Sequence, residues 1–153
     1  MTQNGVSKIV RTYHKNANIE YEGIISNNRK EGFGSCYHEN GWPKYQGYHK
    51  LDKKQGHGVE YNENGIKIYE GNFEHDKHHE IGTKYHPSEG YKEFEGYFVK
   101  NKKHGKGISH FPNGNQKFVG YWEEDHKHGE GIEFYCKNNK KRVGRWQQGL
   151  KCG

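Results

Sequence analysis

Aromatic residues and glycines recur along this chain in a fixed phase. The triplet aromatic-x-Gly opens each period, at Tyr21-Glu22-Gly23, Tyr45-Gln46-Gly47, Tyr69-Glu70-Gly71, Phe94-Glu95-Gly96 and Phe118-Val119-Gly120, with a degenerate copy at Arg142-Val143-Gly144. Successive triplet glycines are 24 or 25 residues apart. A second motif, Gly-x-Gly, follows each triplet, and Glu80 replaces its first glycine in the third period. Such regularity predicts one structural unit used several times.

Within each period, ring and glycine positions alternate with polar ones. In the fourth period, Phe94, Gly96 and Phe98 occupy the first, third and fifth places, and Glu95 lies between them. A period of two places the rings and glycines on one face of a β-strand and the polar residues on a wetter face. The first segment of each period is therefore predicted to be a strand with one aromatic face.

Turn residues follow the second segment of each period. Asn64-Gly65 and Asn113-Gly114 tolerate the positive φ that tight turns require. The third period has one extra residue near His86-Pro87-Ser88, and Asn138 takes the turn-glycine place in the fifth. Each period is therefore predicted to be one β-hairpin of two short strands, stacked on the next hairpin.

This pattern resembles the MORN repeat (membrane occupation and recognition nexus), whose units read Tyr-x-Gly-x-aromatic, a spacer, Gly-x-Gly and then Asn/Asp-Gly. The predicted fold class is all-β, an elongated single-layer antiparallel meander of stacked β-hairpins with about twelve strands. We expect a single MORN repeat domain over residues 1–153. Its predicted parts are a partial unit at 1–20, repeats at about 21–44, 45–68, 69–93, 94–117 and 118–141, and a partial sixth unit at 142–153.

Incomplete units are predicted near both ends of the chain. Residues 9–13 have the pattern of a second strand, Trp146 holds the fifth place of a sixth unit, and Gly153 stands where another Gly-x-Gly would begin. A strand at the edge of a sheet presents unpaired backbone groups. We expect one or both edges to bind a partner or a second copy of the chain.

Composition agrees with a thin but folded core. Only 29% of residues are hydrophobic and the mean hydropathy is −1.36, values typical of disorder, but 14% are aromatic and bury a large area each. No apolar run approaches the roughly 18 residues that span a bilayer, and the first residues lack the apolar stretch of a signal peptide. The three cysteines fit a reduced compartment. We therefore expect an intracellular, cytoplasmic protein.

The predicted turns inside the hairpins are rich in cations. All turns of one kind lie along one edge of a meander, so a row of cations is expected to face an anionic partner or lipid. The net charge of +6 permits such a partner. The alternative is that these turns are simply solvated in a lysine-rich protein. The predicted basic edge consists of Arg29, Lys30, Lys53, Lys54, Lys77, Lys102, Lys103 and Lys127.

No catalytic or cofactor-binding arrangement is expected. The Gly-x-Gly motif lacks the third glycine and the following helix of a dinucleotide site. Cys36 and His38 fall on the same face of a strand, but no third group accompanies them. His79, His104 and His128 recur two strands apart, about 9–10 Å, which is too far to share one zinc ion. We therefore expect no enzyme activity, cofactor or metal.

The resemblance implies a structural scaffold or adaptor that binds proteins in a larger complex, in a cytoskeletal assembly such as a cilium or axoneme. The cytoskeleton or cilium is favoured over the membrane periphery. The alternative is a peripheral membrane module that binds phosphoinositide or other anionic lipid through the basic edge. No nucleic acid is expected, because the aromatic residues hold structural repeat positions.

The aromatic face is the predicted protein-binding surface. A one-layer sheet cannot cover both of its faces, so we expect this face to be partly exposed unless a partner covers it. The alternative is that the rings only pack on one another. The predicted binding residues are Tyr45, Tyr69, Phe73, Phe94, Phe98, Phe118, Trp122 and Trp146.

Overall fold

The computed structural model describes residues 6–137 and 140–152, so the predicted roles of Asn138 and Gly153 lie outside the described residues. The described residues form thirteen β-strands and no helix, and the strands follow chain order within the sheet. The predicted all-β antiparallel meander is confirmed. The strand count exceeds the expected twelve because β13 (Leu150–Cys152) adds a short strand after the last turn. No helix among these residues is long and apolar enough to cross a membrane.

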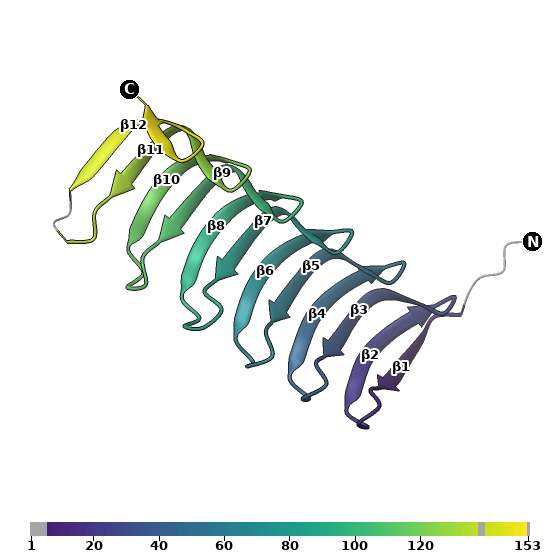
Figure 1. Ribbon diagram of the computed structural model, residues 1–153. Helices are drawn as coiled ribbons and strands as arrows, with labels where there is room; N and C mark the ends of the chain where they lie inside the picture. The colour runs from purple at the N-terminus through teal and green to yellow at the C-terminus, as the bar shows by residue number, and fades with distance from the viewer. Residues whose placement is uncertain (1–5, 138–139, 153) are drawn as a thin grey trace, which may run out of the picture. The chain divides into compact units, whose positions relative to one another are not determined.

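Contacts divide the chain into two compact units, residues 1–77 and 78–153, and each is described by itself. Unit 1 holds β1 (Lys8–Tyr13), β2 (Ile19–Ser26), β3 (Arg29–Tyr37), β4 (Pro43–Lys50), β5 (Lys53–Tyr61) and β6 (Lys67–Glu74). Unit 2 holds β7 (Lys77–Tyr85), β8 (Lys92–Val99), β9 (Lys102–His110), β10 (Gln116–Glu123), β11 (His126–Phe134), β12 (Lys141–Gln147) and β13 (Figure 1). The prediction of a single domain stays a prediction.

Two-residue turns close the hairpins of each repeat. In the first repeat Asn27 and Asn28 have φ of 50° and 60°, and in the second Leu51 and Asp52 have φ of 51° and 70°. Positive φ at both central residues is the geometry whose twist matches that of the flanking strands. Because only two residues form each turn, the cations that follow the turns belong to the strands.

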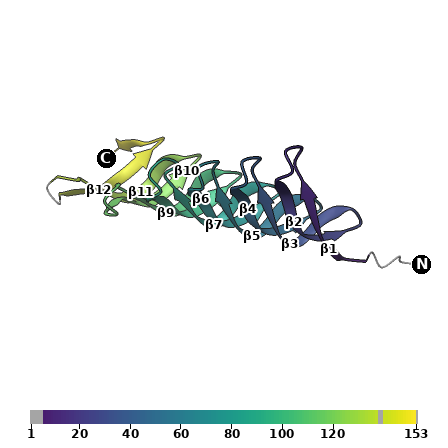
Figure 2. The same ribbon diagram turned by 90° about the horizontal axis from the view of Figure 1, so that it is seen from below.

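A bulge bends each hairpin beyond its turn. Between β2 and β3 the register shifts from Gly23↔Gly34 to Ile25↔Lys30, and Gly32 within the shift has a φ of 69°. Its equivalents are Gly56, Glu80, Gly105 and Gly129, all with positive φ. A bulge with a left-handed residue bends its strand and increases the local twist. The hairpins are accordingly curved rather than flat, as Figures 1 and 2 show.

Side chains at the turns tie each hairpin to the one before it. The Oδ1 of Asp52 accepts a hydrogen bond from the backbone N–H of Lys30 at 2.8 Å, and the N–H of Asp52 donates to the carbonyl of Lys30 at 3.2 Å. The same two contacts join Asp76 to Lys54, Asn101 to His78 and Asp125 to Lys103. Each turn therefore satisfies backbone groups of its neighbour, which keeps successive hairpins in register.

The core is a row of rings on one face of the sheet, here called the ring face. Its nine buried residues are Tyr21, Tyr45, Tyr69, Phe73, Phe94, Phe98, Phe118, Trp122 and Trp146. The triplet rings of Tyr21, Tyr45, Phe94 and Phe118 lie over glycines of their own strand and of the next. A Cβ added to Gly58 would lie 2.4 Å from the Tyr45 ring, and one added to Gly107 would lie 2.2 Å from Cζ of Phe94. The rings can therefore pack in these places only because the residues beneath them are glycines.

Candidate interaction surfaces

The ring face is buried, so the expectation that it is partly exposed is wrong. The predicted binding residues are all between 0% and 7% exposed, namely Tyr45, Tyr69, Phe73, Phe94, Phe98, Phe118, Trp122 and Trp146. Neighbouring rings meet edge to face. In unit 2, centroids of Phe118 and Trp122 are 5.3 Å apart and those of Phe118 and Trp146 are 5.0 Å apart. Since the curved hairpins bring each ring against the next, these side chains form the core and leave little area for a partner.

Half of the predicted basic edge covers the rings instead of lining an edge. The Nζ atoms of Lys54 and Lys127 lie 5.1 Å and 4.9 Å from the ring centroids of Tyr45 and Phe118. Lys30 and Lys103 lie over rings in the same manner. Each is the second residue after its turn, where strand alternation directs the side chain to the ring face. The prediction that these four lysines face outward along the edge is therefore wrong.

The other four cations of the predicted edge, Arg29, Lys53, Lys77 and Lys102, are exposed beside the turns. They do not form a uniformly positive row. Lys102 pairs with Glu124 at 2.6 Å, and Asp52 and Asp76 stand in the same turns as the cations. Acidic and basic groups therefore alternate along these turns, which weakens their field toward an anionic surface.

Two of the ring-covering lysines are neutralised by a glutamate six residues further along the chain. Lys54 pairs with Glu60 and Lys127 with Glu133, and all four side chains are largely buried. Burial opposes ionisation of Glu133, but hydrogen bonds from Lys127 and Arg142 hold its pKa below the usual range. The place of the glutamate is taken by Cys36 in the first repeat, Lys84 in the third and Ser109 in the fourth.

Cys36 is near a histidine, but not the one expected. Its Sγ lies 3.7 Å from Nε2 of His49 and 3.8 Å from Nζ of Lys30, whereas Nε2 of His38 contacts the carbonyl oxygen of Tyr61 at 3.1 Å. Burial raises the pKa of the Cys36 thiol, although nearby lysines oppose this, and burial also lowers the pKa of His49. Both groups are therefore held neutral, which does not favour a nucleophilic thiolate.

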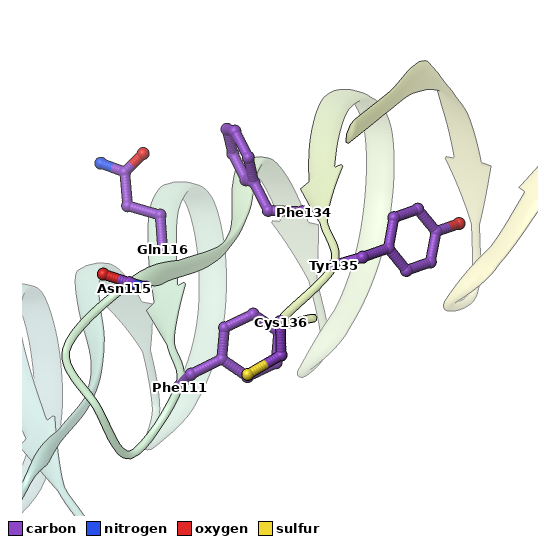
Figure 3. Close-up of a pocket in the computed structure, with 6 residues that line it drawn as sticks. All are labelled: Phe111, Asn115, Gln116, Phe134, Tyr135 and Cys136. Carbon is purple, nitrogen blue, oxygen red and sulfur yellow. The ribbon is translucent and has the colours of Figure 1, made fainter. Parts of the chain in front are cut away.

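The described residues contain no group of three or more His, Cys, Asp or Glu side chains arranged to hold a metal ion. One cavity of about 350 Å³ lies in unit 2 beside two turns between hairpins (Figure 3). It is lined by Phe111, Asn115, Gln116, Phe134, Tyr135 and Cys136. These residues bring together no acid and base pair, so the cavity offers no evident catalytic chemistry.

The face opposite the rings carries an apolar patch in unit 2 that the sequence analysis did not predict. Here called the outer patch, it exposes Ile81 (58%), Tyr97 (47%), Tyr121 (44%) and Val143 (65%). Half-buried aliphatic side chains lie between them at Ile108, Val119 and Ile132. The strand register pairs Ile81 with Tyr97 and aligns Ile108, Val119, Ile132 and Val143 on neighbouring strands, whereas Tyr121 pairs with Lys106 and His128.

Unit 1 keeps more of the wetter character expected for this face. Glu22, Gln46 and Glu70 occupy the middle place of the aromatic-x-Gly triplet, where unit 2 has Glu95, Val119 and Val143. Its exposed aromatic pair is Phe33 and Tyr48, with centroids 5.7 Å apart. The sequence did contain an indication of the outer patch. Ile81, Val119 and Val143 are the middle residues of their motifs, and a period of two places them all on the same face of the strands.

The model of the MORN repeat matches five segments of the chain, residues 21–42, 45–67, 69–91, 94–116 and 118–140. Together they cover more than half of the sequence. A comparison with curated proteins finds no significant match.

Proposed function

Because the chain belongs to the MORN repeat family, whose repeats serve as protein- and lipid-binding modules, we propose that it is a non-catalytic scaffold or adaptor that binds a partner protein. The outer patch carries this proposal. It holds four exposed apolar side chains, and the rings of the ring face are buried in the core. Burial of apolar area contributes roughly 25 cal/mol per Å², so such a patch favours a covering surface.

Charged groups beside the exposed rings of the outer patch suit a protein partner. The ammonium of Lys106 lies 5.8 Å from the ring centroid of Tyr121, and Glu130 and Arg145 face each other at 3.5 Å. An apolar centre with a charged rim is the usual composition of a protein interface. The partner is therefore expected to present an apolar segment flanked by charges.

The test compares two double variants as immobilised full-length bait in native extract. Tyr97→Ser with Tyr121→Ser removes the exposed rings of the outer patch, and Lys53→Ser with Lys102→Ser removes two edge cations as the matched control. Quantitative mass spectrometry is expected to show specific partners lost with the ring variant and kept with the lysine variant. Partners kept by the ring variant and lost by the lysine variant would contradict the proposal. Circular dichroism establishes that both variants are folded.

A second candidate function is peripheral binding to anionic membranes through the exposed cations Arg29, Lys53, Lys77 and Lys102. The net charge of +6 supports it, and the acidic residues among the turns argue against strong binding. Attraction between exposed charges is screened within about 8–10 Å at physiological salt. Sedimentation with phosphoinositide-containing vesicles at low salt tests this function, and an absence of sedimentation removes it.

The proposed setting is the cytoplasm, in a cytoskeletal or ciliary assembly. Its support is the MORN family resemblance together with a surface suited to protein binding. Extraction of cells with detergent and then with rising salt tests the setting. Retention in the detergent-insoluble fraction is expected, and release by detergent together with membrane proteins would favour the membrane candidate.

A further inference from the structure

The ring-covering lysines show what chemistry their place in the repeat prefers. In the second and fifth repeats the ammonium lies over buried rings and pairs with a glutamate of the same strand, Lys54 with Glu60 and Lys127 with Glu133. A half-buried ammonium is costly without an opposite charge, and the carboxylate compensates for that cost. The chain therefore supplies a carboxylate to two of these cations.

The fourth repeat has the cation without the carboxylate. Nζ of Lys103 lies 5.1 Å from the ring centroid of Phe94 and 5.0 Å from that of Trp122. Six residues along, where the other two repeats have glutamate, stands Ser109. Within the part of the chain that the structure describes, Lys103 makes no ion pair with a carboxylate.

Ser109 is a buried polar group without a partner. It is 7% exposed, and its Oγ has no hydrogen-bond partner among the described residues. The register places it opposite Phe94 on one side and Phe118 on the other, both fully buried. A serine side chain ends where a glutamate continues, so its hydroxyl stands at the base of the place that a carboxylate occupies in the other repeats.

The charges around this place favour an anion. Burial lowers the pKa of Lys103, and Lys84 and Lys117 lower it further, whereas Glu93 and Asp125 raise it. Lys84 itself holds the glutamate place of the third repeat and is paired with Phe94 on the neighbouring strand. The Oδ1 of Asp125 accepts the backbone N–H of Lys103 and is thus engaged at the turn. With Lys103 itself, three lysines and two carboxylates interact electrostatically at this place, and one of the carboxylates, Asp125, is already engaged.

We propose that Lys103 and Ser109, with Lys84 beside them, form a carboxylate-binding subsite on the ring face that takes an aspartate or glutamate side chain of a partner protein. The bound carboxylate accepts hydrogen bonds from the Lys103 ammonium and the Ser109 hydroxyl, in the place that Glu60 and Glu133 occupy in their own repeats. A carboxylate is favoured over a phosphate because two other repeats hold a glutamate carboxylate beside the equivalent lysine. The subsite lies on the face opposite the outer patch and does not depend on it.

The test titrates the full-length chain with N-acetyl-glutamate amide, a blocked amino acid that presents one carboxylate. The ε-methylene NMR signals of the lysines are followed at constant ionic strength. We expect saturable shifts at Lys103 and none at Lys54 and Lys127, which serve as internal controls because their carboxylates are already in place. Equal responses at the three lysines would overturn the proposal.

The variant Ser109→Glu supplies the carboxylate from the chain itself. The affinity of the Lys103 site for N-acetyl-glutamate amide is expected to fall at least about tenfold, because the introduced carboxylate already makes the charge-assisted hydrogen bonds. An unchanged response in this variant contradicts the proposal. Ser109→Ala keeps the cation and is expected to bind more weakly than the natural chain, which covers the case in which Ser109→Glu does not fold. Inorganic phosphate is the comparison probe, and tighter binding of phosphate than of the blocked glutamate would overturn the assignment to a carboxylate.

Discussion

Each triplet ring of the core lies against glycines that have no side chain to hold it away. The ring of Phe94 occupies the space where a Cβ of Gly107 would stand, and this ring is fully buried. The repeat therefore requires glycine here for a steric reason, separate from any conformational one.

The substitution Gly107→Ala is expected to destabilise the protein by about 3 kcal/mol, because an overpacked core displaces a buried ring. Gly114→Ala is the control, since a Cβ there meets nothing within 4 Å and adds only the strain of a φ of +88°. Urea denaturation measures both. A smaller loss at Gly107 than at Gly114 would show that the ring can move aside.

Glu80 is the one non-glycine residue at the bulge position of the five repeats. Its φ of 56° is left-handed, like that of Gly32, Gly56, Gly105 and Gly129, but it carries a Cβ that makes this conformation unfavourable. Glu80 thus adopts the backbone conformation of these glycines in spite of its side chain.

Replacement of Glu80 by Gly is expected to stabilise the protein by about 1 kcal/mol, because the left-handed strain is removed. Glu130→Gly is the matched control at an exposed strand position without positive φ, and it is expected to destabilise. The midpoint of thermal unfolding distinguishes them. A lower midpoint for Glu80→Gly would mean that the Glu80 side chain stabilises the fold by more than its left-handed backbone strain destabilises it.

At the scale of elements, the hairpins are joined by more than strand pairing. The acidic or amide residue at the second place of four turns bonds to the backbone of the hairpin before it, as Asp52 does with Lys30 and Asn101 with His78. The spacing of these residues was visible in the sequence. The partner of each side chain was not, because it lies 22 or 23 residues away.

Removal of this acceptor with Asp52→Ala is expected to lower the free energy of unfolding by about 1 kcal/mol, because the N–H of Lys30 loses its partner. Asp52→Asn keeps an oxygen acceptor, as Asn101 does, and is expected to be close to neutral. Hydrogen exchange at the amide of Lys30 checks the mechanism directly. Faster exchange is expected only in the alanine variant, and equal exchange in both would contradict the role of the side chain.

At the scale of the whole molecule, the two units differ in the chemistry of their cores. Unit 1 has tyrosine at the triplet position, and the hydroxyls of Tyr21, Tyr45 and Tyr69 donate to backbone carbonyls within the same strand at 2.8–2.9 Å. Unit 2 has Phe94 and Phe118 at the same position. Burial raises the pKa of Tyr21 to about 12 and raises the pKa of Tyr45 and Tyr69 as well.

These phenols are expected to make unit 1 sensitive to alkali. A group whose pKa is higher in the folded state stabilises the fold fully below the unfolded value of 10.0, and the contribution is lost as pH rises through the folded value. Between about pH 10 and 12, hydrogen exchange is expected to report loss of protection in unit 1 before unit 2. The triple change of Tyr21, Tyr45 and Tyr69 to Phe is expected to move this loss to higher pH. Simultaneous loss in both units, unaffected by the triple change, would contradict the argument.

The sequence by itself determined the repeat, the family, the strand order and the face of the strands that the rings share. A fixed phase of rings and glycines sets the strand period, and Asn-Gly turns at Gly65 and Gly114 have the positive φ that they require. These features are local, since they follow from backbone conformation and from neighbours a few residues apart. Strand alternation also showed that Tyr45, Phe98 and Trp122 share one face.

Only the tertiary structure decided what each face does. Bulges at Gly32 and its equivalents curve the hairpins, and this curvature buries the rings and brings Lys54 and Lys103 over them. Period two separates the faces but does not say which is covered, so the rings were wrongly predicted to be accessible. The cross-strand register also placed His49 beside Cys36 and aligned the outer patch. Such contacts join residues of different strands, and their distances depend on register and bending, which a single strand pattern does not contain.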